Sequence, residues 1–169
     1  MSVEKAIQTT KEIITQRGYK ITEIEDDKIL GTRGTEKICI FTGIVSKFSI
    51  GRVKEYLSIL ETMNIKNCIV IYTDQVTPKA KKLIENAIDV IIELFTLCEL
   101  QYNITKHKLV PQHVKLSPHE SKKFKEHFGV KFPTLLKTDP VSRFYNFKRG
   151  DIIKIIRSNG YISYRIVKG

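Results

Sequence analysis

The sequence predicts a protein of two domains: an α/β domain over residues 1–105 and a small α+β domain with a β-hairpin over residues 106–169. In the first part, short apolar runs alternate with segments of helical periodicity, which is typical of an α/β domain with partly parallel strands. In the second part, an extended segment and a helix precede two apolar runs. Asn159-Gly160, the strongest short hairpin signal, divides those runs.

A step in charge is the third observation that separates the two parts. Residues 1–106 hold 15 Lys+Arg and 14 Asp+Glu, whereas residues 107–169 hold 14 and 4, so nearly all of the net charge of +11 lies in the second part. Such asymmetry indicates an acidic partner, either nucleic-acid phosphates or an acidic protein surface. A surface charge that only aids solubility does not explain why one part carries it.

The elements of the first domain follow from periodicity and end signals. Thr77 is the predicted N-cap of the third helix, with Pro78 at its first position, and Gly18 is the predicted end of the first helix. In chain order, the expected helices and strands are "VEKAIQTTKEIITQRGY" (helix), "KICIFTG" (strand), "IGRVKEYLSILETM" (helix), "NCIVIYTD" (strand), "TPKAKKLIENAI" (helix) and "VIIELF" (strand).

The second domain has clearer local signals. "HKLVPQHVKL" is expected to be extended because Pro111 does not fit a regular helix. "SPHESKKFKEHFG" is a helix in which Ser117 and Glu120 form a capping box and Gly129 ends the last turn. "TDPVSRFY" is a turn with a short helix, and "DIIKIIR" and "YISYRIV" are the hairpin strands.

The composition argues against several kinds of protein. The chain has no run of 18 or more apolar residues and its first residues are charged, so we expect neither a membrane span nor a signal peptide. Cys39, Cys68 and Cys98 lie singly inside apolar segments. We expect them to be buried free thiols in a reducing compartment, with no disulfide and no cysteine-based zinc site.

Signals for catalysis are weak. The sequence has no Gly-rich phosphate loop and no Ser or Cys nucleophile signature, and the spacing of the histidines matches no familiar metal site. Asp26 and Lys28 have the spacing found in metal-dependent nucleases, but a charged hairpin turn explains them better. We therefore expect no catalytic activity, no cofactor and no bound metal. The histidines are His107, His113, His119 and His127.

Four stretches of the second domain resemble the C-terminal domain of a small RNA polymerase subunit, which is called subunit 5 in eukaryotes and has a shorter counterpart in archaea. They are "HKLVPQHVKLS", "DPVSRF", "KRGDIIKIIR" and "YISYRIV", in the order of that family. "QRGY", "TPKAKKLIE" and "ELQYNITKH" extend the resemblance to the N-terminal domain of the eukaryotic form, which the archaeal form lacks. The short "SNG" loop, "FPTLL" and Asn146 depart from the family pattern. These departures suggest the polymerase of a large DNA virus or of an unusual eukaryote.

The resemblance implies a non-catalytic structural subunit of DNA-dependent RNA polymerase. It implies that the C-terminal domain docks on the largest subunit. It also implies that the N-terminal domain, with a nuclease-like fold but no nuclease activity, forms part of the jaw near downstream duplex DNA. Further partners would be other polymerase subunits and transcription factors. The protein would act in the nucleus if it is cellular, and in the cytoplasm or virion if it is viral. A free-standing basic nucleic-acid-binding protein and, less favoured, a metal-dependent nuclease are the alternatives.

Two sets of residues are candidates for these contacts. Cations in the second domain are expected to form a strongly positive face that docks on an acidic protein surface, because Arg forks suit carboxylates as well as phosphates. The docking candidates are His113, Arg143, Lys148, Arg149, Gly150 and Arg157, with Lys154 and Arg165 on the same positive face. The start of the third helix is the expected DNA-proximal site, because it offers backbone N–H groups and the positive end of the helix dipole. An ordinary solvated helix start remains an equal alternative, and any DNA contact there would be independent of base sequence. The DNA-proximal candidates are Thr77, Pro78, Lys79 and Lys81.

Overall fold

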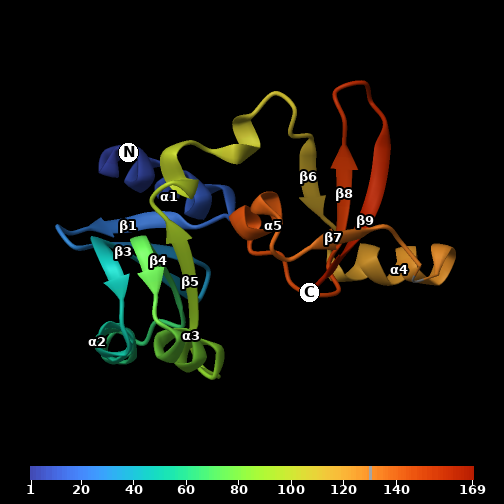
Figure 1. Cartoon of the computed structure of the whole chain (residues 1–169). Coiled ribbons are helices and arrows are strands. Elements are labelled where there is room, and N and C mark those ends of the chain that lie inside the picture. The colour runs from blue at the N-terminus through green and yellow to red at the C-terminus, as the bar shows by residue number, and fades with distance from the viewer. Residues whose placement is uncertain (130) are drawn as a thin grey trace. The chain divides into compact units, whose positions relative to one another are not determined.

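The computed structural model describes residues 1–129 and 131–169. They divide into an N-terminal unit, Met1–Tyr102, and a C-terminal unit, Asn103–Gly169. Each unit contains one sheet (Figure 1). The sequence placed the boundary after residue 105, close to this division. The chain is thus a mixed α/β protein with two sheets, as the sequence predicts.

The N-terminal unit is built on a five-stranded sheet with the order β1-β2-β3-β4-β5. The first three strands pair antiparallel, and β3, β4 and β5 pair parallel, which confirms the prediction of partly parallel pairing. The strands are β1 (Lys20–Ile24), β2 (Lys28–Arg33), β3 (Glu36–Phe48), β4 (Asn67–Val76) and β5 (Ile91–Thr96).

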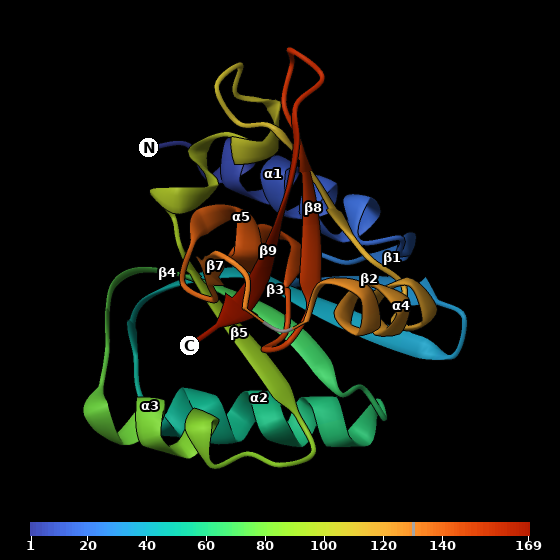
Figure 2. The same cartoon turned by 90° about the vertical axis from the view of Figure 1, so that its right-hand side faces the viewer.

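Helices cover both faces of this sheet. Figures 1 and 2 show α1 on one face, and α2 and α3 side by side on the other. A short 3-10 helix, η1, follows β5 and packs against α1. The helices of the unit are α1 (Val3–Gln16), α2 (Ile50–Thr62), α3 (Pro78–Glu85) and η1 (Glu99–Gln101).

Alternation along β3 creates two apolar layers. Cys39 and Phe41 belong to the buried cluster shared with α2 and α3. Ile38, one residue earlier, points to the opposite face. There Ile38 and Ile14 of α1 each have an atom 3.3 Å from the place that a Cβ on Gly31 would take. Burial on both faces explains why these strands read as continuous apolar runs.

The predicted helix ends are confirmed. The α1 helix closes with a Schellman motif, in which the N–H of Gly18 bonds to Thr15 and the N–H of Tyr19 bonds to Ile14. The α3 helix begins at Pro78, and the hydroxyl of Thr77 accepts a hydrogen bond from the N–H of Ala80 at 3.3 Å. Strands β1 and β2 were not predicted, although the charged turn between them was predicted.

The C-terminal unit contains a four-stranded sheet with the order β6-β8-β9-β7. The β6–β8 and β8–β9 pairs are antiparallel, and β7 adds to β9 in parallel. The short strand β7 lies in "FPTLL", for which no strand was predicted. The elements of the unit are η2 (Ile104–Lys106), β6 (Gln112–Lys115), α4 (Pro118–Phe128), β7 (Thr134–Leu136), α5 (Pro140–Tyr145), β8 (Ile152–Ile156) and β9 (Ile162–Lys168).

The two faces of this second sheet differ in their covering. Ile153 and Ile155 of β8 belong to a buried cluster on one face, together with Phe147. On the other face, the ring of Phe124 in α4 lies 4.3 Å from the ring of Tyr164 in β9. No side chain of α4, whose residues are all described, is buried. This helix therefore depends strongly on its ends, and the predicted capping box at its start is confirmed.

The predicted hairpin is confirmed. Its loop closes with two hydrogen bonds of 2.9 Å, from the N–H of Arg157 to Tyr161 and from the N–H of Gly160 to Arg157. Gly160 has φ 81°, a conformation that glycine adopts without strain. The side chain of Asn159 also accepts a hydrogen bond from the N–H of Tyr161. A tight, well-bonded loop therefore joins β8 and β9.

The prediction for the cysteines is correct for two and wrong for the third. Cys39 and Cys68 are buried free thiols, whereas Cys98 is exposed because it lies in the turn after β5. Burial raises the pKa of Cys39 to about 12 and also raises that of Cys68. Among the helices that the structure describes, none is both long and apolar enough to cross a membrane.

Candidate interaction surfaces

Residues 148–151 form a tight turn before β8, called here the pre-β8 turn. The N–H of Lys148 donates to the carboxylate of Asp151 at 2.8 Å, and the N–H of Asp151 donates to the carbonyl of Lys148 at 3.0 Å. Gly150 has φ 90°, and its N–H bonds to Val167 of β9 at 2.9 Å. Arg149 is exposed at the tip. The turn therefore holds an exposed cation on a backbone that is fastened to the sheet.

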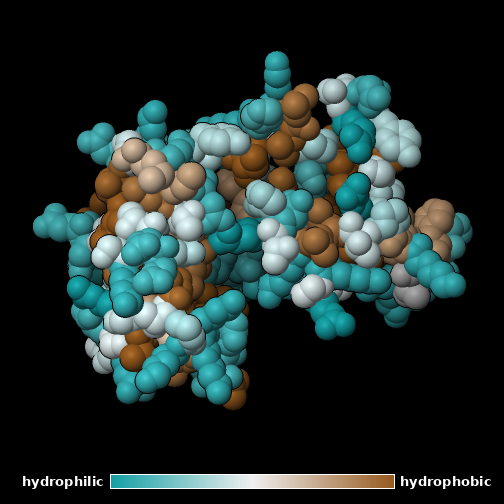
Figure 3. All heavy atoms as spheres, viewed as in Figure 1, coloured by the Kyte–Doolittle hydropathy of each residue, from teal (hydrophilic) through white to brown (hydrophobic). Residues whose placement is uncertain are grey.

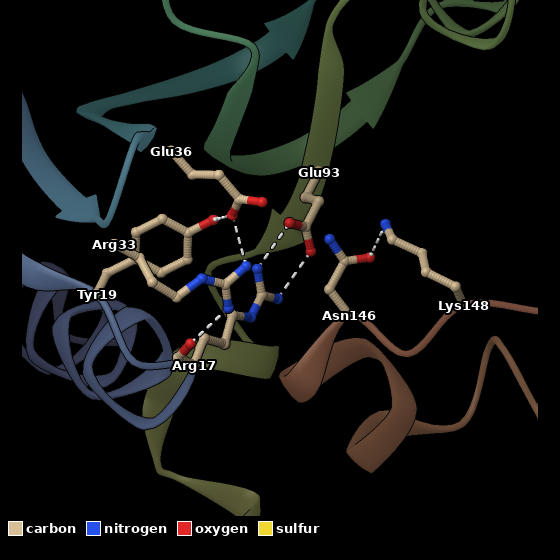
Figure 4. Close-up of polar contacts among 7 residues, drawn as sticks. All are labelled: Arg17, Tyr19, Arg33, Glu36, Glu93, Asn146 and Lys148. Atoms are coloured by element: carbon tan, nitrogen blue, oxygen red, sulfur yellow. Dashed lines mark hydrogen bonds and ion pairs between the residues drawn. The ribbon is translucent and has the colours of Figure 1, made fainter. Parts of the chain in front are cut away.

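The short helix α5 lies just before this turn and carries Arg143. The carboxylate of Asp139 caps α5 by accepting a hydrogen bond from the N–H of Val141 at 2.8 Å. Asn146 ends the helix in the left-handed conformation, with φ 53° and ψ 45°. The ammonium of Lys148 donates to the Asn146 side chain at 2.7 Å, as Figure 4 shows. Asparagine tolerates this backbone conformation better than most residues other than glycine, so the helix can end here without a glycine.

His113 and Arg157 lie at the other end of β8. His113 of β6 pairs with Ile155, near the end of β8, and Arg157 begins the hairpin loop. The ring nitrogen Nδ1 of His113 donates to the carbonyl of Pro111 at 2.8 Å. Burial lowers the pKa of His113 below its ordinary value, and this hydrogen bond opposes the shift only in part.

The predicted docking residues therefore do not form one site. Arg149 and Arg157 are separated by the whole of β8, and a strand advances roughly 3.3 Å per residue. The prediction of one positive face also fails for the pair Lys154 and Arg165, which cannot both lie on it. Lys154 pairs with Tyr164 and Arg165 pairs with Ile153, so Lys154 and Arg165 point to opposite faces of the sheet.

The carboxylates of the C-terminal unit mainly hold the backbone. Asn103–Gly169 contains 15 Lys+Arg but only 4 Asp+Glu. Glu120, Asp139 and Asp151 each accept a hydrogen bond of 2.8 Å from a backbone N–H, and Asp151 also pairs with Lys115 at 2.9 Å. Too few carboxylates are present to pair with the cations of the unit. Its surface therefore carries positive charge that the unit itself does not neutralise.

The DNA-proximal candidates lie at one edge of the N-terminal sheet. Phe48 and Val76 are paired at the carboxyl ends of β3 and β4, and α2 and α3 start directly after these strands. The N–H of Thr77 bonds to the carbonyl of Phe48 at 3.1 Å, which ties the start of α3 to this edge. Lys79 and Lys81 are exposed. The start of α2 at the same edge was not predicted, although a strand followed directly by a helix was the available signal.

A cluster of polar side chains at the end of α1 was not predicted. Arg17 makes a bidentate pair with Glu93 of β5, with N–O distances of 2.7 and 2.8 Å (Figure 4). Arg33 donates to the carbonyl of Arg17 at 2.7 Å and to Glu36 at 2.6 Å. The hydroxyl of Tyr19 also donates to Glu36, at 3.2 Å. These contacts tie the end of α1 to β5 through Arg17 and to β2 through Arg33, and they come from residues far apart in sequence.

The nuclease-like spacing of Asp26 and Lys28 is explained by local structure. Both residues lie at the β1–β2 turn, where the ammonium of Lys28 pairs with Glu25 and contacts Asp27 at 3.4 Å. This confirms the interpretation as a charged hairpin turn. Within residues 1–129 and 131–169, no group of three His, Cys, Asp or Glu residues is placed to hold a metal ion.

Comparisons with known proteins point in one direction. Residues 102–167 match the family model described as RNA polymerase Rpb5, C-terminal domain. The chain is 34% identical to a protein of Invertebrate iridescent virus 6 that is named as a DNA-directed RNA polymerase subunit, over 97% of this chain and 98% of the viral one. It is 30% identical to the Dictyostelium discoideum subunit rpabc1 of DNA-directed RNA polymerases I, II and III, over 78% and 72% of the two chains. The corresponding subunit of Caenorhabditis briggsae is 28% identical, over 95% and 92%.

Proposed function

The chain belongs to the Rpb5 family of RNA polymerase subunits, and from this membership we propose that it is a non-catalytic structural subunit of a DNA-directed RNA polymerase. The observation that carries the proposal is the viral polymerase subunit, which is 34% identical over nearly the full length of both chains. A match across both units supports a role for the whole chain.

The proposed attachment to the polymerase is through the C-terminal unit, with the largest subunit as partner. Arg143 and the pre-β8 turn, with Lys148, Arg149 and Gly150, form its main contact. The excess of cations over carboxylates in the unit supports an acidic docking surface. His113 and Arg157 are proposed as a second contact, at the hairpin end of β8.

The proposed role of the N-terminal unit is to form part of the jaw near downstream duplex DNA. The start of α3, with Thr77, Pro78, Lys79 and Lys81, would lie near the phosphates. Exposed cations beside a helix start support this role, because both attract phosphate oxygens whatever the base sequence. We further propose that this unit has a nuclease-like fold without nuclease activity. Other polymerase subunits and transcription factors are proposed as additional partners of the chain. The chain would act in the nucleus if it is cellular, and in the cytoplasm or virion if it is viral.

Affinity purification of the tagged full-length chain from its native cells tests the assembly. The wild-type chain should co-purify with the largest polymerase subunit. Charge reversal at Arg143 and Arg149 should remove the polymerase chains from the purified material, because an unpaired charge at an interface costs several kcal/mol. The matched reversal at Lys79 and Lys81 should leave assembly intact and weaken only the binding of downstream DNA.

Controls separate loss of docking from loss of folding. Both double variants should keep the circular dichroism spectrum and the amide NMR spectrum of the wild-type chain. If the Arg143/Arg149 variant still assembles and the Lys79/Lys81 variant does not, the roles assigned to the two units are wrong. Purification of the wild-type chain with nucleic acid alone would instead favour a free-standing nucleic-acid-binding protein.

A further inference from the structure

A groove lies at the hairpin end of the C-terminal unit, at the opposite end of β8 from the pre-β8 turn. We call it the hairpin-end groove. Its volume is about 550 Å³, and it lies between the segment that leads into β6 and the start of the β8–β9 loop. Its lining is formed by residues 108–112 and 156–159.

Apolar side chains gather on the rim of this groove. Figure 3 shows hydrophobic residues at the surface in the upper part of the C-terminal unit, above β6 and beside the hairpin. Leu109 is 78% exposed and Tyr161 is 62% exposed. Val114 and Ile162, on the sheet beside the groove, are 37% and 43% exposed. Folding alone does not bury these side chains, so they are available for contact with another molecule.

The strand register shows that the sheet contributes to the same apolar surface. Val114 pairs with Lys154, and Ile162 pairs with Ile156. Lys154 and Ile156 are two residues apart on β8, so Val114 and Ile162 point to the same face of the sheet. Tyr164, which α4 covers through Phe124, is two residues from Ile162 and also lies on this face. This face of the sheet is thus covered by α4 at Tyr164 and remains partly exposed at Val114 and Ile162.

The charge of the groove has one sign only. Lys108 and Arg157 are its charged lining residues. Neither is paired with a carboxylate in the part of the chain that the structure describes. Within the C-terminal unit, the sequence has no Asp or Glu in residues 103–119 or in residues 152–169, which include the whole lining of the groove. A negatively charged ligand therefore complements the charge of this groove.

Strand β6, whose first residue Gln112 lines the groove, also has a free edge on the side that faces away from β8. In the order β6-β8-β9-β7, β6 is an edge strand and leaves one side of its backbone without a strand partner among the described residues. Such an edge can accept a further strand, whose backbone supplies affinity while alternate side chains enter neighbouring pockets.

We propose that the hairpin-end groove binds an extended acidic segment of another polypeptide, with apolar residues at alternate positions. The acidic side chains would meet Lys108 and Arg157, and the apolar ones would pack on Leu109 and Ile162. A nucleic-acid strand fits less well, because the rim is mostly aliphatic and single-strand binders use aromatic side chains to stack bases. Because Arg157 is also the proposed second contact with the polymerase, this proposal rests on the proposed function, to which it adds the chemistry of the segment that this end of the unit binds.

Titration of the isotope-labelled full-length chain tests the proposal. The probe is a short peptide of alternating Asp and Leu residues. It should shift amide signals of residues 108–114 and 156–162 in a saturable way and leave the signals of residues 148–151 unchanged. A peptide of alternating Asp and Ser should bind at least about tenfold more weakly, because the apolar contacts are lost.

Matched variants separate a specific groove from general attraction to positive charge. Arg157→Glu and Leu109→Ser should each weaken binding of the Asp–Leu peptide by about tenfold, and both positions are exposed, so the fold should persist. Lys123→Glu makes the same charge reversal at an exposed position of α4 and should change the affinity less than about twofold. The proposal is overturned if the peptide does not saturate or if Lys123→Glu weakens binding as much as Arg157→Glu. It is also overturned if a single-stranded RNA or duplex DNA oligonucleotide shifts the groove signals and the peptide does not.

Discussion

The two units use their carboxylates for different purposes. Met1–Tyr102 contains 14 Lys+Arg and 14 Asp+Glu, and it forms side-chain pairs such as Arg17–Glu93 and Arg33–Glu36. Asn103–Gly169 contains 15 and 4, and three of its carboxylates accept hydrogen bonds from backbone N–H groups. One unit balances its charge internally, whereas the other keeps a net charge of +11 that only an external anion can offset. Charge counted unit by unit therefore indicates which part of the chain meets acidic partners.

The largest loss of stability should come from a substitution in the apolar core of the N-terminal unit. The charges of this unit are balanced, so its stability rests on the burial of apolar side chains. Leu60, which is 0% exposed, packs in the cluster between the sheet and α2. Leu60→Ala should lower the free energy of unfolding by about 2–5 kcal/mol. Urea denaturation, with hydrogen exchange of the N-terminal amides, measures the loss. Leu109→Ala at an exposed site is the control, and an equal loss there would contradict the comparison.

Internal pairing of charge predicts a smaller effect at Glu93. Glu93→Gln keeps the shape of the side chain but removes the charge that faces Arg17 across two short hydrogen bonds. The free energy of unfolding should fall by about 1–3 kcal/mol. Lys123→Gln in the C-terminal unit, where cations exceed carboxylates, should change it by less than about 0.5 kcal/mol. If thermal and urea denaturation show equal losses of stability for the two variants, pairing of charges does not stabilise the N-terminal unit more than the C-terminal one.

The backbone before the pre-β8 turn allows a test inside the basic unit. Asn146→Ala and Asn146→Gly both remove the acceptor for Lys148, but only alanine resists the left-handed conformation at φ 53°. The alanine variant should therefore be about 1 kcal/mol less stable than the glycine variant. Denaturation of the two variants side by side measures this difference. Equal stability would mean that the turn relaxes and does not hold Arg149 rigidly.

The smallest effect concerns pH and the capping carboxylate of α4. Hydrogen bonds from Ser117 lower the pKa of Glu120. A lowered pKa in the folded state stabilises the fold above the pKa of the unfolded chain, about 4.3 for Glu, and this contribution is lost as the pH falls through the folded value. NMR titration of the Glu120 carboxyl should give a pKa below the ordinary value. Glu120→Gln keeps an acceptor at this position but removes the titrating carboxyl, so it should remove this part of the acid sensitivity of α4. An unchanged pH profile would show that ionisation of Glu120 contributes nothing to the stability of the helix.

Local signals in the sequence predicted much of the fold. Caps such as Thr77 and Ser117 and the Asn159-Gly160 turn depend on neighbouring residues only, so their positions could be predicted correctly. Strand β7 has three residues and exists only because β9 lies beside it, a partner that sequence periodicity does not indicate. The exposure of Cys98 was missed for a similar reason, since an apolar neighbourhood in sequence does not show where a strand ends.

The candidate surfaces were less predictable than the elements that carry them. Composition showed that the cations gather in the second part of the chain, but not how the strands distribute them. The alternation of β8 and β9 places Lys154 and Arg165 on opposite faces, and the length of β8 separates Arg149 from Arg157. Both facts require the register of the sheet, which no local motif reveals. The hairpin-end groove likewise forms from two segments that are distant in sequence.

The unequal burial of the three thiols has a practical consequence for chemical labelling. Cys39 and Cys68 stand opposite each other on β3 and β4, and burial raises the pKa of both, so at neutral pH they react slowly with maleimides. Cys98 is exposed and can carry a single fluorophore on the wild-type chain without any engineered cysteine. Labelling of the remaining two thiols would then record how often the N-terminal sheet opens. The natural sequence thus contains one attachment point for a dye and two internal reporters of unfolding.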